Sequence, residues 1–227
     1  GAWLNGALML DLRAEPHVQL WLGAADVDVG NVLRQLKLAR DVEAGFGRFT
    51  LYLDSHSGQL SGLLANAKLV GEITGGKMVL RDPGSGTKVS VVIRQGTLTA
   101  MPGERVRLEV GAALDEIPVD IALHSAPVRD LIDPSRRVPF ELSISAVNTR
   151  LVLSGTMDRD IEARDVELGM KVQGERLNHL DKLLRVSLPP WGPWSAAGRF
   201  RMSARGYEVD DLQLKVASST LHGRGSL

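Results

Sequence analysis

Residue types that could perform catalysis lie side by side near the end of one predicted strand. Asp54, Ser55 and His56 supply the acid, nucleophile and base types of a hydrolytic triad in consecutive positions. Neighbouring residues of a strand point to opposite sides of its sheet, so this segment by itself cannot assemble a triad. The chain also lacks the G-x-S-x-G nucleophile elbow. We interpret the segment as a strand end followed by a helix cap at Ser57.

Candidate ligands for a metal ion or a phosphate lack the spacing that such sites need. The histidines are scattered, without an HExxH pair, at positions 17, 56, 124, 179 and 222. Asp26-Val-Asp28 and Asp158-Arg-Asp160 lack the further ligands and the glycine of a calcium loop, which favours capping and turn roles. Gly75-Gly-Lys77 lacks the upstream glycine and the following Ser or Thr of a phosphate loop. We therefore expect no metal, no cofactor and no enzymatic activity.

The overall composition argues against further classes of protein. Lys and Arg number 27 and Asp and Glu number 27, so the formal net charge is zero and no nucleic-acid partner is expected. Cysteine is absent, which excludes a disulfide framework. No apolar run approaches the roughly 20 residues of a membrane-spanning helix, and no signal-peptide pattern is present. We expect the chain to be a segment of a longer protein.

The elements that must position a site are predicted mainly by alternation. From Val138 onward, apolar residues alternate with polar ones in several segments, which is the pattern of strands with one apolar side. Such strands are typical of antiparallel sheets rather than of a doubly wound parallel sheet. Seven residues are predicted to share an apolar surface: Leu142, Ile144, Leu151, Leu153, Val166, Leu168 and Met170.

We predict an all-β-dominated fold, a β-rich α+β chain built on an elongated, curled antiparallel sheet with a concave apolar face. Short helices are expected at 28–37, 57–66 and 176–185, with at most a helical turn at Pro127 to Ile132 and a hairpin between Leu69 and Leu80 turned at Gly75-Gly76. The plan of strands, a short helix and more strands occurs twice, which predicts β-rich units at 1–133 and 134–227 that form one continuous sheet.

Two questions stay open at this level. An apolar sheet side can be hidden in a sandwich, closed into a barrel, or left as a groove that an acyl chain covers. Trp191 and Trp194 flank a Pro-Gly corner, where a core plug is favoured over a membrane-interface or ligand-stacking pair.

The last third of the chain resembles the C-terminal repeat region of the AsmA family of bacterial envelope proteins, which includes the larger TamB-like members. The shared order is strand, helix, proline corner and three strands, carried by Arg176-Leu-Asn-His-Leu, Leu188-Pro-Pro, Gly198-Arg-Phe, Tyr207-Glu-Val-Asp-Asp-Leu and Ser219-Thr-Leu-His-Gly. A second similar feature is Ser57-Gly-Gln-Leu-Ser-Gly-Leu-Leu-Ala65 before Gly71-Glu-Ile-Thr-Gly. Ala217 departs from the pattern, which has glycine there.

The resemblance implies a non-enzymatic function. Family members are thought to carry phospholipid across the periplasm along an apolar groove and so to support outer-membrane biogenesis. On this basis the partners are phospholipid acyl chains, and the full-length protein is periplasmic and anchored to the inner membrane of a Gram-negative bacterium. The alternative is a structural or protein-interaction β-domain of an envelope assembly factor, which has no lipid ligand and binds other envelope proteins through an edge strand.

Overall fold

The computed structural model describes residues 2–13, 15–28, 42–59, 62–81, 88–133, 136–157, 166–203 and 206–226. Strands make up 72% of the structure, and the described residues add two short α-helices and one 3₁₀-helix. The predicted all-β-dominated, antiparallel fold is confirmed.

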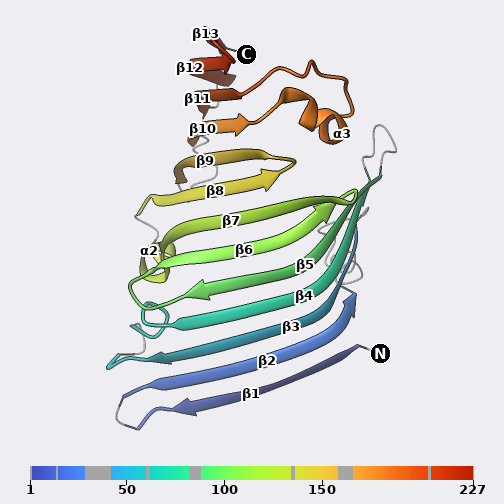
Figure 1. Ribbon diagram of the computed structural model, residues 1–227. Helices are drawn as coiled ribbons and strands as arrows, with labels where there is room; N and C mark the ends of the chain where they lie inside the picture. Colours follow the sequence, from blue (N-terminus) through green and yellow to red (C-terminus); the bar gives the residue numbers. More distant parts are fainter. Residues whose placement is uncertain are drawn as a thin grey trace. The chain divides into compact units, whose positions relative to one another are not determined.

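Thirteen strands form a single antiparallel sheet that does not close on itself. Each strand pairs with the next one in the sequence, so β1 and β13 are the two edges (Figure 1). The strands are β1 (Trp3–Asp11), β2 (His17–Asp28), β3 (Val42–His56), β4 (Lys68–Arg81), β5 (Lys88–Ala100), β6 (Arg105–Leu114), β7 (Ile117–Pro127), β8 (Val138–Ala146), β9 (Thr149–Met157), β10 (Val166–Gly174), β11 (Trp194–Ser203), β12 (Gly206–Val216) and β13 (Ser219–Ser226).

Tight turns explain why neighbours in sequence are neighbours in the sheet. Asp115 and Glu116 join β6 to β7, and Val147 and Asn148 join β8 to β9, all four with positive φ. Two-residue turns with positive φ match the twist of antiparallel strands and bring consecutive strands into register. Ala217, with φ of 50°, begins the equally short turn between β12 and β13.

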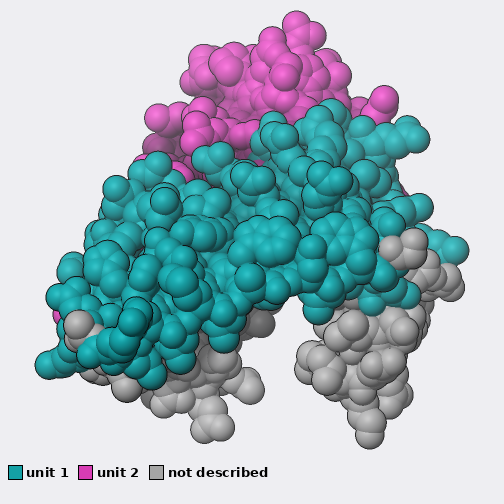
Figure 2. Space-filling view, turned by 90° about the horizontal axis from the view of Figure 1, so that it is seen from below, with its two compact units in different colours: residues 1–120, 127–132 teal, residues 121–126, 133–227 magenta. Residues whose placement is uncertain are grey.

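The chain divides into two compact units, coloured separately in Figure 2. Unit 1 comprises Gly1–Asp120 and Pro127–Ile132, and unit 2 comprises Ile121–Ala126 and Asp133–Leu227. The assignment of each unit to an AsmA-like repeat stays a prediction.

The long strands of unit 1 bend along their length (Figure 1). Irregular backbone positions lie at the same level of neighbouring strands in this unit. Asp26 of β2 has φ of 52°, Gly75 of β4 has φ of 67°, and the register between β5 and β6 shifts at Arg94. A Cβ on Gly47, which lies between Asp26 and Gly75, would come within 2.9 Å of the Thr74 carbonyl oxygen. Bulges and left-handed glycines bend a strand locally, which accounts for the curvature.

The hairpin predicted at Gly75-Gly76 is wrong. β4 runs through this pair as one strand from Lys68 to Arg81 and stays paired with β3 and β5 on both sides of it. The freedom of Gly75 to adopt positive φ is used here to bend a strand rather than to reverse the chain.

The helix predictions have mixed outcomes. The predicted helix at 176–185 is present as a 3₁₀-helix, η2 (Leu177–Leu180), that continues into one turn of α-helix, α3 (Asp181–Leu184). The helical turn expected before 133 is α2 (Val128–Ile132). These helices lie in the connections between strands: α2 follows β7, and η2 and α3 lie between β10 and β11.

Among the residues that it describes, the structure does not show a helix at either of the other two predicted positions, 57–66 and 28–37. The described part of 57–66 forms hydrogen-bonded turns, with Asn66 N–H donating to the Gly62 carbonyl, and not a continuous helix. Of the range 28–37, Asp28 ends β2, and the remainder lies outside the described residues. The described residues therefore do not show the expected repeat of strand, helix and strand, which stays a prediction.

The buried core is thin because the chain forms one layer. No large side chain among the described residues is completely buried. The buried apolar residues are mostly small: Ala24, Ala67, Ala100, Ala112, Val119, Ala126, Val138 and Trp194. A domain normally buries one side of its sheet against a second layer, and the described residues contain no second sheet.

Candidate functional site

In unit 2 the strand registers align apolar residues into rows across the sheet. Leu142 of β8 lies opposite Leu153 of β9, which lies opposite Met170 of β10. Ile144 lies opposite Leu151 in the same pair of strands. Directly opposite residues project from the same side of a sheet. The registers therefore place five of the seven predicted surface residues on one side.

The other two predicted residues lie in β10. Leu168 is opposite Gly155 of β9 and Phe200 of β11. A Cβ on Gly155 would lie 3.0 Å from Leu168 Cδ2, so the leucine side chain covers this glycine. Val166 is opposite Met202, two positions along the same side. The register thus assigns the seven positions predicted from alternation to one side of β8, β9 and β10, which we call the apolar rows of unit 2; the side chain of Val166 lies outside those that the structure describes.

The apolar rows are only partly covered by the described protein. Six of the seven side chains are half-buried: Leu142, Ile144, Leu151, Leu153, Leu168 and Met170. Side chains in a closed core make contacts on all sides and become fully buried. Here the flanking strands supply neighbours within the layer, and the side chains keep part of their surface accessible.

Sequence alternation missed the continuation of these rows into β11–β13. Val172 lies opposite both Leu151 and Ala196, and Ala196 lies opposite Leu214 of β12. Leu212 belongs to the same side, because a Cβ on Gly198 would lie 3.5 Å from Leu212 Cδ1. The signal was a set of alternating leucines and valines in 207–216, but a bulge interrupts its period.

Unit 1 has equivalent rows. Leu20 of β2 lies opposite Leu8 of β1 and Leu53 of β3, and Leu53 lies opposite Leu69 of β4. A second row joins Leu22, Leu51, Gly71, Leu98 and Leu108. The large residues of these rows are half-buried within the sheet, and Leu8 on the edge strand is 68% exposed. The pattern of unit 2 is therefore found in unit 1 as well.

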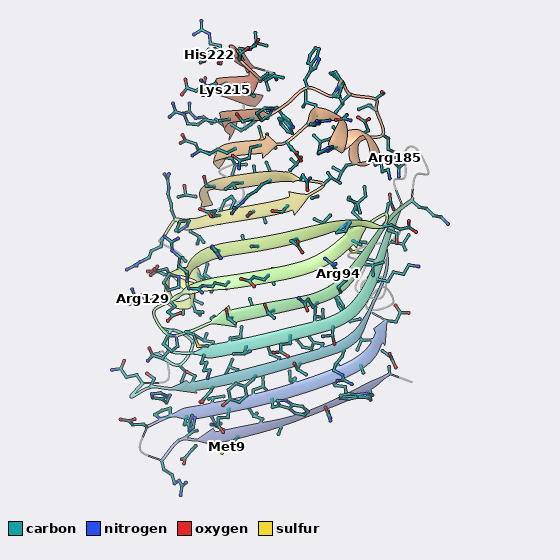
Figure 3. The ribbon with its side chains drawn as sticks, in the orientation of Figure 1. Met9, Arg94, Arg129, Arg185, Lys215 and His222 are labelled. Atoms are coloured by element: carbon teal, nitrogen blue, oxygen red, sulfur yellow. The ribbon has the colours of Figure 1, made fainter. Side chains whose placement is uncertain are left out.

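The opposite side of unit 2 is charged. Arg201 pairs with Glu208 at 3.6 Å, and Arg199 pairs with Asp211. Hydrogen bonding to Asp211 raises the pKa of Arg199 above its ordinary value. Lys215 and His222, labelled in Figure 3, project from β12 and β13. This side is suited to contact with water.

A cavity of about 510 Å³ lies at β10–β13. Its lining residues are Glu167, Arg199, Phe200, Arg201, Asp210, Asp211, Leu212, His222, Gly223 and Arg224. Three arginines and three carboxylates balance one another, and the lining holds no serine, threonine or cysteine. The cavity therefore has no net charge that would select an ion, and its lining offers no hydroxyl or thiol nucleophile from these residue types.

A polar cluster on β2 and β3 holds the acid and base types noted in the sequence. His17 Nε2 donates to Asp54 Oδ1 at 2.8 Å, and the Tyr52 hydroxyl donates to Asp54 Oδ2 at 3.1 Å. The hydrogen bond from His17 lowers the pKa of Asp54 below its ordinary value. Partial burial, together with the bond to Asp54, raises the pKa of Tyr52. His56 stands edge-on to His17, with ring centroids 6.3 Å apart.

The serine between these residues does not join them. Ser55 is buried, and its hydroxyl donates to the Leu63 carbonyl. Asp54 and His17 lie on the other side of the sheet, as alternation requires. The Asp54-Ser55-His56 sequence thus forms no nucleophile–base pair, and among the described residues no group of three or more acidic or histidine side chains is placed to hold a metal ion.

The two tryptophans of the Pro-Gly corner have different environments. Trp194 is 7% exposed at the start of β11, whereas Trp191 is 62% exposed. The predicted core plug is correct for Trp194 alone.

No helix in the described parts of the chain is long and apolar enough to cross a membrane. No protein-family model matches the chain, and no curated protein or solved structure matches it.

Proposed function

We propose that this chain is a non-enzymatic lipid-binding module that carries phospholipid in the cell envelope. Acyl chains lie along the apolar rows, on the concave side of a curled sheet, and polar headgroups project into water. The module acts passively and needs no covalent chemistry or cofactor. The AsmA resemblance extends the proposal to the periplasm, to an inner-membrane anchor in the full-length protein, and to outer-membrane biogenesis.

One observation carries the proposal: rows of large apolar side chains cross an open sheet, and none of the described large side chains is completely buried. Apolar surface left in water costs roughly 25 cal/mol per Å². A soluble chain with a single layer has few ways of removing this cost by itself. An acyl chain supplies the missing cover without any polar group that needs a partner.

The geometry of the rows suits a linear apolar ligand. Leu142, Leu153 and Met170 succeed one another across three strands, so the row runs perpendicular to the strands. Neighbouring strands are about 4.8 Å apart, and a row through five strands therefore spans about 19 Å, the length of an extended acyl chain of about 15 carbons.

Native mass spectrometry of the purified chain, followed by lipid extraction, tests the proposal. We expect phospholipid to co-purify, and we expect the delipidated chain to bind a fluorescent phospholipid again. A chain that purifies without lipid and does not bind the fluorescent phospholipid would contradict the proposal and favour the protein-interaction alternative.

A further inference from the structure

The connection between β10 and β11, residues 175–193, gathers the exposed apolar residues of unit 2. Leu184, Val186 and Trp191 are 52%, 50% and 62% exposed. Among the described residues of unit 2, Leu221 on the edge strand is the other large apolar side chain exposed to this degree. Figure 1 shows the connection, with α3, projecting beyond the ends of β10 and β11.

Hydrogen bonds hold this connection in a defined conformation. Leu177 N–H donates to the Trp191 carbonyl at 2.9 Å, which ties the two ends of the segment together. Leu188 N–H donates to Asp181 Oδ1 at 2.8 Å, and Ala217 N–H donates to the Pro193 carbonyl at 2.9 Å. The backbone of the connection is therefore fixed at several points, and the exposed side chains belong to a folded segment.

The connection carries a net positive charge. It contains three cationic residues and two acidic ones. Both carboxylates accept hydrogen bonds from the protein: Glu175 from Asn148 Nδ2 at 3.1 Å, and Asp181 from Leu188 N–H. The cationic Arg176 and Lys182 are exposed, and Arg185, labelled in Figure 3, lies beside α3 between the exposed Leu184 and Val186.

We propose that the 175–193 connection docks on the surface of an anionic lipid bilayer. Trp191, Leu184 and Val186 enter the interfacial region, where tryptophan is favoured because its ring is apolar and its N–H is polar. The exposed cations lie at the level of the anionic headgroups. Docking would bring the apolar rows to a membrane from which lipid can be loaded or to which it can be delivered, and in this respect the inference extends the proposed function.

Vesicle flotation tests the inference, with vesicles of phosphatidylcholine with and without phosphatidylglycerol. We expect the chain to float with the anionic vesicles, to do so less at high salt, and to bind pure phosphatidylcholine weakly. Trp191→Ala should weaken binding about tenfold or more, because a tryptophan contributes a large apolar area. Leu184→Ser should weaken it in the same direction.

Trp3→Ala is the matched control, since Trp3 is 44% exposed on β1 of unit 1 and should leave vesicle binding unchanged. Circular dichroism establishes that each variant folds. Binding that survives both Trp191→Ala and Leu184→Ser, equal binding to neutral and anionic vesicles, or an equal loss in Trp3→Ala would each overturn the inference. Lipid co-purification is measured separately, so a chain that carries lipid but does not float contradicts docking alone.

Discussion

Replacing Leu153 by Asp separates a lipid-covered surface from an ordinary core. Leu153 lies in the middle of a row, opposite Leu142 and Met170, and its side chain is half-buried. A carboxylate at this position would stand where the acyl chain is proposed to lie. Because an ionised carboxylate strongly resists leaving water, we expect bound lipid to be lost.

The expected loss of stability follows from the burial of this side chain. Fully burying a leucine contributes about 1.5–3 kcal/mol, so a half-buried one contributes about half as much. A carboxylate on an open surface stays hydrated and adds little further cost. We therefore expect Leu153→Asp to lower the free energy of unfolding by about 0.8–1.5 kcal/mol, or Tm by about 2–6 °C. An unpaired charge in a closed core would cost about 3–5 kcal/mol.

Val152→Asp is the matched control for this experiment. Val152 is the neighbouring residue in β9, is also half-buried, and lies on the other side of the sheet, opposite Ser143 and Lys171. This variant should keep its lipid. Native mass spectrometry and thermal melting of the wild type and both variants give the answer. A wild type without lipid, together with a Leu153→Asp chain that does not fold, would refute our reasoning and identify the apolar rows as core.

Three further predictions concern the fold. Ala217→Gly should raise the free energy of unfolding by about 1 kcal/mol in chemical denaturation, because the φ of 50° is strained for alanine and free for glycine. Gly192→Ala should destabilise the chain by more than about 2 kcal/mol, since its Cβ would overlap a backbone carbonyl, whereas Gly225→Ala, with open space around it, should not. Leu8→Lys should reduce self-association in sedimentation experiments, because a lysine protects an edge strand and β1 also exposes Leu4, Met9 and Leu10. Leu221 on β13 is equally exposed, but β13 has no other exposed large apolar side chain among the described residues, so Leu221→Lys should have less effect; equal effects would contradict this view of β1.

Local sequence predicted the strands well because alternation is a local property. Residues two apart in a strand share a side whatever the strand pairs with, so Leu142 and Ile144 could be assigned together before any register was known. The separation of Ser55 from Asp54 follows from the same rule. The short helix near 176–185 was also predictable, since its apolar spacing lies within one segment.

Glycine and bulge positions were predicted poorly because their roles depend on the neighbouring strands. Gly75 has the sequence of a turn, yet pairing on both sides of β4 makes it a bend within a strand. Asp211, with φ of 51°, shifts the register of β12, so Val209 and Leu212 share a side although they are three residues apart. A count of alternating residues cannot detect such a shift.

The sequence by itself determined the β-rich, antiparallel class of fold and which residues of one strand share a side, because each depends on residue type and on spacing over a few positions. The tertiary structure decided which strands join the rows, that Trp194 is buried while Trp191 is exposed, and that His17 pairs with Asp54. These contacts join residues that are distant in the sequence. They are set by register, and register depends on the turns and bulges of every intervening strand.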